Sequence, residues 1–149
     1  GINPTFEEVL FMKISTKGRY ALRVLVDLAE HSVDRNVSIR EMAERQNISD
    51  KYLEGIVARL SAAGYVKSVR GKYGGYQLTK EPKDYTLYDI LAATEDSIAV
   101  VACLEDEINT CPMSEGCRTL PLWEHLQNHL REYMQSLTLQ DVIDRHFTV

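Results

Sequence analysis

The residues with the clearest chemical potential are three cysteines, Cys103, Cys111 and Cys117, in a 149-residue chain. Seven residues separate the first two and five separate the last two, in a segment that also contains Pro112 and Gly116. Structural zinc sites use ligand pairs two to four residues apart, so this spacing disfavours zinc. Iron–sulfur clusters are larger than one ion and accept wider loop spacings. The spacing therefore favours a cluster, but it leaves open cysteines that bind no metal or that form a redox pair.

A site with three cysteines needs a fourth ligand, and the sequence leaves that ligand open. His125 and His129 are four residues apart and could bind a metal, although such a pair more often belongs to a polar helix surface. A residue of a second subunit is another candidate. The acidic residues of the loop itself are Asp106, Glu107 and Glu115. Cys117 lies near the start of an expected long helix, where the helix dipole favours a thiolate.

The charges of the chain are divided between its two halves. Residues 12–80 carry 13 Lys and Arg against 7 Asp and Glu, whereas residues 81–149 carry 4 against 13. A basic first half suggests contact with a polyanion such as nucleic acid, which the acidic half avoids. The longest apolar run, 98–104, is too short to cross a membrane, and no signal peptide is evident. We therefore expect a cytoplasmic protein with reduced thiols and no membrane partner.

The elements that position these residues are mainly helices. Apolar residues at helical spacing predict a first helix over about 15–29. A capping box formed by Ser38 and Glu41 predicts a short helix over 38–45. A third helix is expected over 49–64, with a glycine at its end. Two short helices joined by a tight turn are typical of a helix-turn-helix.

A β-hairpin is expected directly after these helices. Residues 65–70 and 76–79 are β-prone and are separated by the glycine-rich segment 71–75. The fold class is therefore mainly α with a small hairpin wing, and residues 12–80 form a winged helix-turn-helix DNA-binding domain. The wing and helices supply the candidate DNA contacts, which are Ser38, Lys51, Tyr52, Glu54, Arg59, Arg70, Lys72 and Tyr73. Of these, Glu54 repels phosphate, so we expect it to accept a hydrogen bond from a cytosine amino group.

The second half, residues 81–149, is expected to hold the cysteine loop and a helical dimerisation region. A helix over 86–94 precedes the irregular loop, and a long helix opens near 119–120 with Pro121 in its first turn. Apolar residues recur along that helix at near-helical spacing, and a short final helix begins near Thr138. Residues 1–11 are interpreted as a leader or a cloning remnant.

With these motifs assembled, the chain resembles the winged-helix regulator family that includes IscR, NsrR and CymR. The likeness covers 12–145, and its motifs lie at 12–21, 49–54, 69–78 and in the cysteine loop before 122–123. The resemblance implies a bacterial homodimer in which the long helices cross and two winged helices bind a pseudo-palindromic operator in double-stranded DNA.

Within that family, three cysteines in this loop distinguish cluster-binding members from those like CymR, so the chain is more similar to IscR. That resemblance implies an iron–sulfur cluster on the three cysteines, [2Fe–2S] rather than [4Fe–4S]. Two positions depart from the family pattern. Leu120 stands where IscR-type proteins place a histidine, and Arg19 stands where NsrR-type proteins place an aspartate; neither can be a ligand.

These observations predict a transcriptional regulator, most simply a repressor, that senses cluster, redox or nitric-oxide status. An alternative is a cluster-free repressor controlled by a partner protein or by thiol oxidation. A winged helix that docks protein instead of DNA is a further alternative. An enzyme is disfavoured because nothing orders a histidine against a cysteine as nucleophilic catalysis requires.

Overall fold

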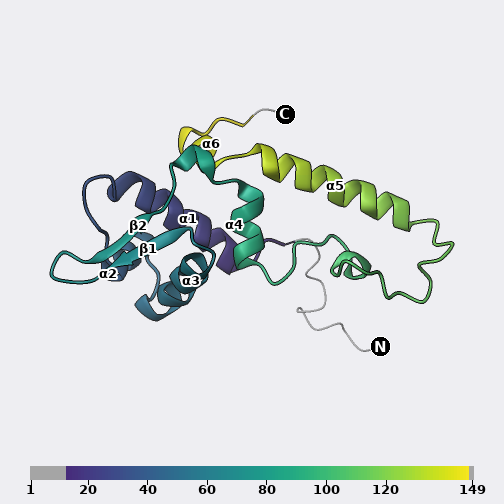
Figure 1. Ribbon diagram of the computed structural model, residues 1–149, viewed down its shortest axis with the longest axis horizontal. Coiled ribbons are helices and arrows are strands. Elements are labelled where there is room, and N and C mark those ends of the chain that lie inside the picture. The colour runs from purple at the N-terminus through teal and green to yellow at the C-terminus, as the bar shows by residue number, and fades with distance from the viewer. Residues whose placement is uncertain (1–12, 148–149) are drawn as a thin grey trace.

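A computed structural model describes residues 13–147, so the interpretation of residues 1–11 as a leader lies outside the described part. The chain forms a helical head that carries a two-stranded wing, and one long helix extends away from it (Figure 1). In chain order the elements, with η for a 3-10 turn, are α1 (Thr16–His31), α2 (Ile39–Gln46), α3 (Asp50–Ala62), β1 (Val66–Val69), β2 (Gly75–Leu78), η2 (Pro82–Asp84), α4 (Leu87–Thr94), η3 (Ala102–Leu104), α5 (Leu120–Ser136) and α6 (Leu139–Asp144).

The helices begin where hydroxyl side chains cap them. Ser15 accepts a hydrogen bond from the N–H of Gly18 at the start of α1. Ser38 and Glu41 form the predicted capping box of α2, with the Ser38 N–H donating to the Glu41 carboxylate over 2.9 Å. Gly64 follows α3 with φ +78, the left-handed conformation expected of a glycine at a helix end. The sequence therefore predicts these helices correctly.

The wing is an antiparallel hairpin in which Val66 pairs with Leu78 and Val69 with Gly75. Two main-chain hydrogen bonds also join Tyr76 to Val37, at 2.7 and 3.1 Å. Val37 lies next to Ser38, the N-cap residue of α2. The wing is therefore attached to the helix-turn-helix by backbone bonds, and its base has little freedom to move independently.

The buried core of the head includes residues from both halves of the chain. Tyr85, Ile90 and Leu139 pack into the same cluster as the apolar faces of α1, α2 and α3. The Tyr85 hydroxyl donates to the carbonyl of Tyr65 over 2.7 Å. The boundary expected near residue 80 therefore divides the basic half of the chain from the acidic half. Residues from both sides of it contribute to one hydrophobic core.

A buried ion pair fastens α1 to α2. Asp27 is 3% exposed and accepts two hydrogen bonds from the Arg45 guanidinium, at 2.8 and 2.9 Å, and one from the Gln46 amide at 3.0 Å. Burial opposes ionisation of the carboxyl, but these three bonds outweigh it and lower the pKa of Asp27.

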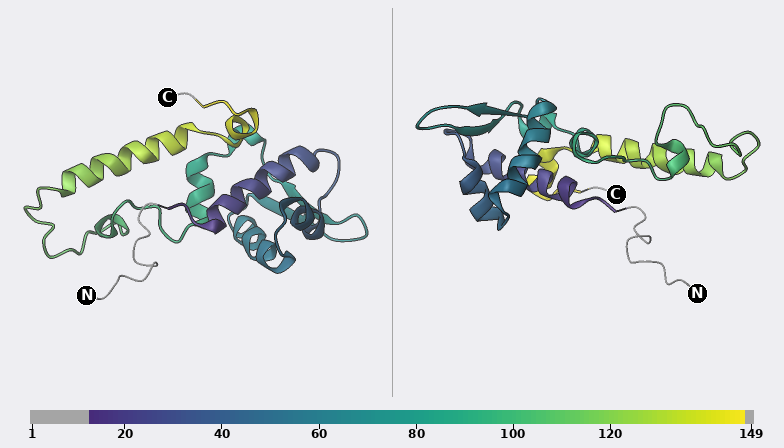
Figure 2. Two further views of the ribbon diagram at one scale, coloured as in Figure 1. Left: turned by 180° about the vertical axis from the view of Figure 1, so that it is seen from behind. Right: turned by 90° about the horizontal axis from the view of Figure 1, so that it is seen from below.

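Helix α5 projects from the head and is tied to it at its C-terminal end. Leu137, just beyond α5, accepts a hydrogen bond from the N–H of Leu87 over 2.9 Å, and the N–H of Leu139 donates to Tyr85 over 3.0 Å. The other end of α5 lies far from the head and is joined to α4 by the long loop of residues 95–119 (Figures 1 and 2). None of the residues of α5 is fully buried. Across the described residues, no helix has the length and apolar character to span a membrane.

Candidate nucleic-acid interface and cysteine loop

Helix α3 presents a polar face outward because its apolar residues point into the head. Leu53, Ile56, Val57 and Leu60 are buried, and the intervening Lys51 and Glu54 are exposed. Tyr52 is partly exposed and packs edge-on against Tyr20, with ring centroids 5.9 Å apart. A helix with its first turns free in this way can enter a DNA major groove, where base edges are read by residues near the helix N-terminus.

A shallow depression of about 430 Å³ lies along this face, between α3 and the start of α1. Its lining residues are Lys17, Ser49, Lys51, Tyr52, Gly55, Ile56 and Arg59. Gly55 is exposed where it lines the depression, and a Cβ there would meet no atom within 4 Å. The depression thus combines three cations with an uncovered stretch of helix backbone, which suits a sugar–phosphate chain. Lys17 could not be identified from the sequence pattern, because only the fold brings α1 beside α3.

Two of these cations are also tied to Asp96, which follows α4. Arg59 donates to the carbonyl of Thr94 over 3.1 Å and lies 3.5 Å from the Asp96 carboxylate. The ammonium of Lys17 is 3.5 Å from the other Asp96 oxygen. The predicted DNA contact Arg59 therefore lies on the outward face and also contacts Asp96, at the start of the loop that carries the cysteines.

The neighbouring carboxylate, Glu95, holds the start of α1. It accepts hydrogen bonds from the N–H and hydroxyl of Ser15, at 2.9 and 2.8 Å. A Cβ at Gly18 would overlap the Glu95 carboxylate, so a larger residue there would make this carboxylate move. We call Glu95 and Asp96 the junction, because together they connect α1 and α3 to the loop.

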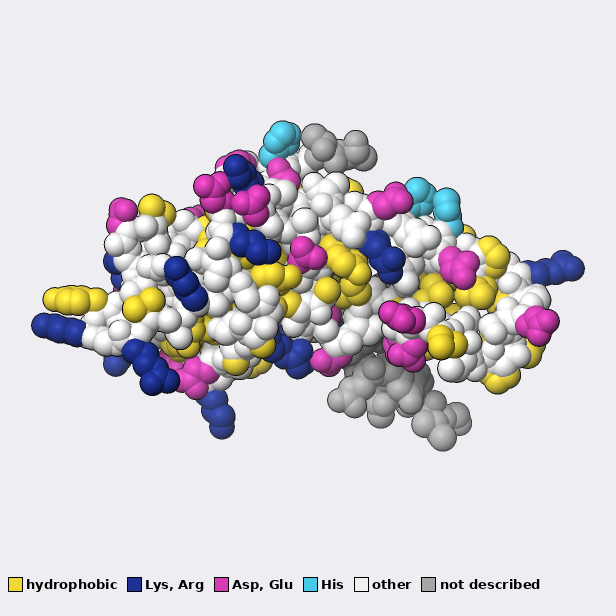
Figure 3. All heavy atoms as spheres, viewed as in Figure 1, with side chains coloured by type: hydrophobic (Ala, Val, Ile, Leu, Met, Phe, Trp, Pro, Cys, Tyr) yellow, Lys and Arg dark blue, Asp and Glu magenta, His cyan; other side chains and the backbone are white. Residues whose placement is uncertain are grey.

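The wing carries the remaining predicted contacts at its tip. Arg70, Lys72 and Tyr73 are all exposed, and Tyr73 reaches 82%. The Asn36 amide donates to the Tyr73 carbonyl over 2.9 Å and so steadies the tip. Several Lys and Arg side chains project from this end of the molecule (Figure 3). Gly75 has φ +149, and a Cβ there would clash with the Val37 backbone, so the wing could not lie as close with another residue.

Ser38 occupies a different setting from the other predicted contacts. Its hydroxyl accepts from the Glu41 N–H and lies 3.2 Å from the Glu41 carboxylate, and the residue is half-buried. The hydroxyl is thus already used in the cap of α2, close to a carboxylate.

The three cysteines lie on the loop between α4 and α5, and all are free thiols and half-buried. Cys103 is in the turn η3, and Cys117 lies just before α5. The Thr119 hydroxyl and the N–H groups of Thr119 and Leu120 lower the pKa of the Cys117 thiol, as expected near a helix start. Within residues 13–147, no three Cys, His, Asp or Glu side chains gather closely enough to hold one metal ion.

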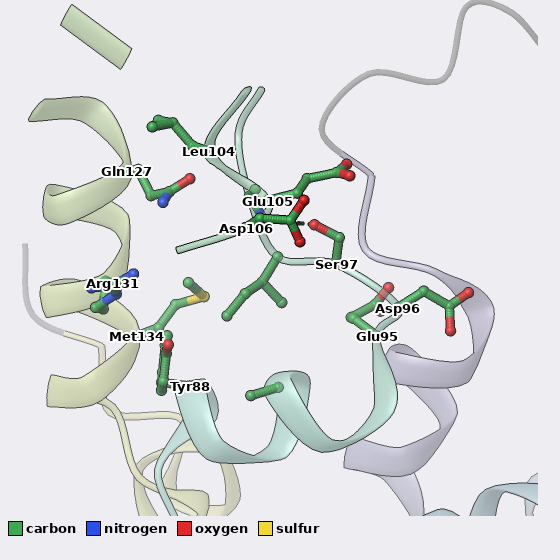
Figure 4. Close-up of a pocket in the computed structure, with 13 residues that line it drawn as sticks. Tyr88, Glu95, Asp96, Ser97, Leu104, Glu105, Asp106, Gln127, Arg131 and Met134 are labelled. Atoms are coloured by element: carbon green, nitrogen blue, oxygen red, sulfur yellow. Dashed lines mark hydrogen bonds between the residues drawn. The ribbon is translucent and has the colours of Figure 1, made fainter. Parts of the chain in front are cut away.

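A pocket of about 420 Å³ separates this loop from α4 and α5 (Figure 4). Arg131 and Gln127 of α5 line one side, and Glu105 and Asp106 of the loop line another. The side-chain amide oxygen of Gln127 accepts a hydrogen bond from the N–H of Val100 over 3.1 Å. Because the loop encloses open space here, it has room to move against the helices.

An exposed α3 beside a basic wing defines a winged-helix protein of the class that binds DNA and regulates transcription. The profile of the Rrf2 family, described as "Iron-dependent Transcriptional regulator", matches residues 14–145. The chain belongs to the Rrf2 family. It is therefore a transcriptional regulator and not an enzyme.

Individual relatives agree with this membership. Protein rrf2 of Nitratidesulfovibrio vulgaris is 37% identical over 132 residues, which cover 89% of this chain and 87% of that protein. The transcriptional regulator CymR of Bacillus subtilis is 40% identical over 131 residues, covering 88% and 89%. The solved structure of this CymR, described as the global cysteine regulator, matches with a TM-score of 0.74 over 92% of this chain and 100% of that chain. The structure of T. potens IscR matches with a TM-score of 0.69 at 34% identity, over 93% of each chain.

Proposed function

We propose that the chain is a homodimeric repressor that binds a pseudo-palindromic operator and is controlled through an iron–sulfur cluster on Cys103, Cys111 and Cys117. The observation that carries the proposal is the junction. The loop with the thiols begins at Glu95 and Asp96, and these two carboxylates hold the start of α1 and the cation Arg59 on the DNA-binding face.

Operator binding divides between the two exposed elements. Near the start of α3, Glu54 accepts from a cytosine amino group and supplies sequence choice, whereas Lys51 binds phosphate. On the wing, Arg70 and Lys72 bind the backbone of the adjoining groove. Affinity therefore comes from the cations and base preference from the carboxylate.

Dimer formation uses α5. Leu122 and Tyr133 on this helix are 55% and 46% exposed, although the helix has an apolar stripe along its length. The head does not cover this apolar stripe, and packing against the α5 of a second subunit buries it. Two heads joined in this way contact two operator half-sites, which matches a pseudo-palindrome.

The donor chemistry of the loop fits a cluster, because three thiols lie on one loop and the environment of Cys117 favours its thiolate. Bound there, a cluster supplies a centre that is sensitive to oxidation and nitric oxide. Cys103, Cys111 and Cys117 would hold it, and because these side chains do not gather into one site in the described loop, the loop would have to rearrange; the pocket beside α5 leaves space for that. Such a rearrangement would act on the junction, whose Asp96 lies 3.5 Å from both Arg59 and Lys17, and so would change how these two cations are presented.

The test is anaerobic purification of the full chain, with absorption spectra, iron and sulfide analysis and DNA binding to a selected operator. Cys111→Ala should remove most of the iron and change operator affinity, whereas the loop control Ser114→Ala should do neither. Asp96→Ala should retain iron but make operator affinity insensitive to its loss. Unchanged iron and affinity in Cys111→Ala would contradict the cluster proposal.

A second candidate is a cluster-free repressor controlled by thiol oxidation or by a partner protein. It is favoured by the similarity to CymR and by the separation of the three thiols within the described loop. Colourless anaerobic protein that forms a disulfide with peroxide, located by mass spectrometry, would support oxidation control. Colourless protein that is indifferent to peroxide would favour the partner.

A further inference from the structure

Two histidines on α5 lie close together outside the cysteine loop. His125 and His129 are exposed, their Nε2 atoms are 3.1 Å apart, and their ring centroids are separated by 4.4 Å. The two positions are four residues apart on a regular helix, so they share one face. They stand between the exposed Leu122 and Tyr133, three residues after the first and four before the second.

The distance between the two nitrogens matches the requirement of a shared metal ion. Bonds from zinc to histidine nitrogen are about 2.0–2.1 Å long. Two nitrogens 3.1 Å apart can both reach an ion at that distance and enclose an angle of about 100° at it. That angle lies close to those of tetrahedral and octahedral coordination. Without an ion, two Nε2 atoms at this distance must share a hydrogen bond, in which one nitrogen carries a proton and donates it to the other.

We propose that His125 and His129 form a binding site for a divalent transition-metal ion of the zinc class, separate from the thiols. Imidazole nitrogen suits zinc, copper and nickel, whereas magnesium and calcium prefer oxygen ligands. Among the described residues no third Cys, His, Asp or Glu joins the pair, so two imidazoles are the ligands that this chain supplies. The surrounding half of the chain is acidic, which raises the local concentration of cations.

A bound ion would connect two side chains on successive turns of α5. Because the folded helix places both ligands in position and the unfolded chain does not, binding stabilises the folded state. The site does not depend on the cluster, because the two sites use different ligands. The metal ion binds imidazoles on α5, whereas the cluster binds thiols on the loop.

The test is a zinc titration of the reduced full chain followed by NMR of its four imidazoles, those of His31, His125, His129 and His146. A chain in which the three cysteines are changed to serine is titrated in parallel, so that thiol binding is separated. His125 and His129 should shift together and saturate at one ion per chain, while the other two histidines stay unmoved. His129→Gln should weaken binding at least about tenfold by leaving a single nitrogen ligand.

The matched control is His146→Gln, which removes an exposed histidine outside the pair and should bind zinc as the wild type does. Zinc should raise the melting temperature of the wild type and of this control but not of His129→Gln, and magnesium should raise none of them. Movement of all four histidines together at millimolar zinc, or equal binding by both variants, would overturn the proposal. Iron content and operator affinity report on the proposed function separately.

Discussion

Removing the exposed cation Lys72 at the wing tip should weaken DNA binding in a salt-dependent manner. Each phosphate neutralised by a cation contributes about 0.9 to the slope of log affinity against log salt on duplex DNA. A dimer that loses one such contact in each wing therefore loses about 1.8 from the slope. Between 50 and 200 mM salt, the advantage of the wild type over Lys72→Ala should shrink about tenfold.

Fluorescence anisotropy with a labelled operator duplex, repeated across that salt range, measures the slope directly. Lys83→Ala is the matched control, because Lys83 is exposed but lies in η2, pairs with Glu81 at 3.2 Å and belongs to neither α3 nor the wing. Its slope should equal that of the wild type. Equal slopes for Lys72→Ala and the wild type would refute a phosphate contact at the wing tip. A decrease of about 0.9 would indicate that one wing only is engaged.

Three further predictions concern the head. Glu54→Ala should reduce discrimination at one base pair of each half-site by about 1–3 kcal/mol, measured by binding to a set of single-base operator variants. Gly55→Ala should stabilise the fold by about 0.5–1 kcal/mol, because the helix gains propensity and the new methyl meets nothing, yet it should weaken DNA binding by filling the depression; calorimetry and anisotropy separate the two effects. Asp27→Asn should cost about 1–3 kcal/mol near pH 7 through the loss of charged hydrogen bonds to Arg45. Because the folded pKa of Asp27 is lowered, its contribution is present above about pH 4 and is lost as the pH falls further, so denaturation curves of variant and wild type should converge in acid.

The helices of the head could be predicted from sequence because local signals define their ends. Ser15, Ser38 and Ser49 each cap a helix through a bond that spans three residues, and Gly64 ends α3 through its own backbone conformation. The wing was equally predictable, although β1 (Val66–Val69) is one residue shorter at each end than the expected 65–70 and β2 (Gly75–Leu78) lies one residue earlier than the expected 76–79.

Contacts between distant segments could not be predicted in this way. Lys17 joins the DNA-binding face only because α1 packs beside α3, and Gly18 lies against a carboxylate that comes 77 positions later in the chain. Spacing identified the thiols as a set, but the loop between α4 and α5 lacks the regular periodicity that would place them relative to one another. Helical periodicity predicted that the two histidines share a face, while their close approach depends on side-chain rotamers.

The attachment of α5 at one end makes it a lever. A helix of 17 residues is about 25 Å long, and its backbone anchor lies beside Tyr85 and Leu87, while Cys117 lies just before the opposite end. Rotation by about 5° at the anchor carries that tip through about 2 Å, a distance comparable with an ordinary bond length between a metal and its ligand. A displacement of about 2 Å at the N-terminal end of α5 therefore corresponds to a rotation of only a few degrees where α5 joins the head.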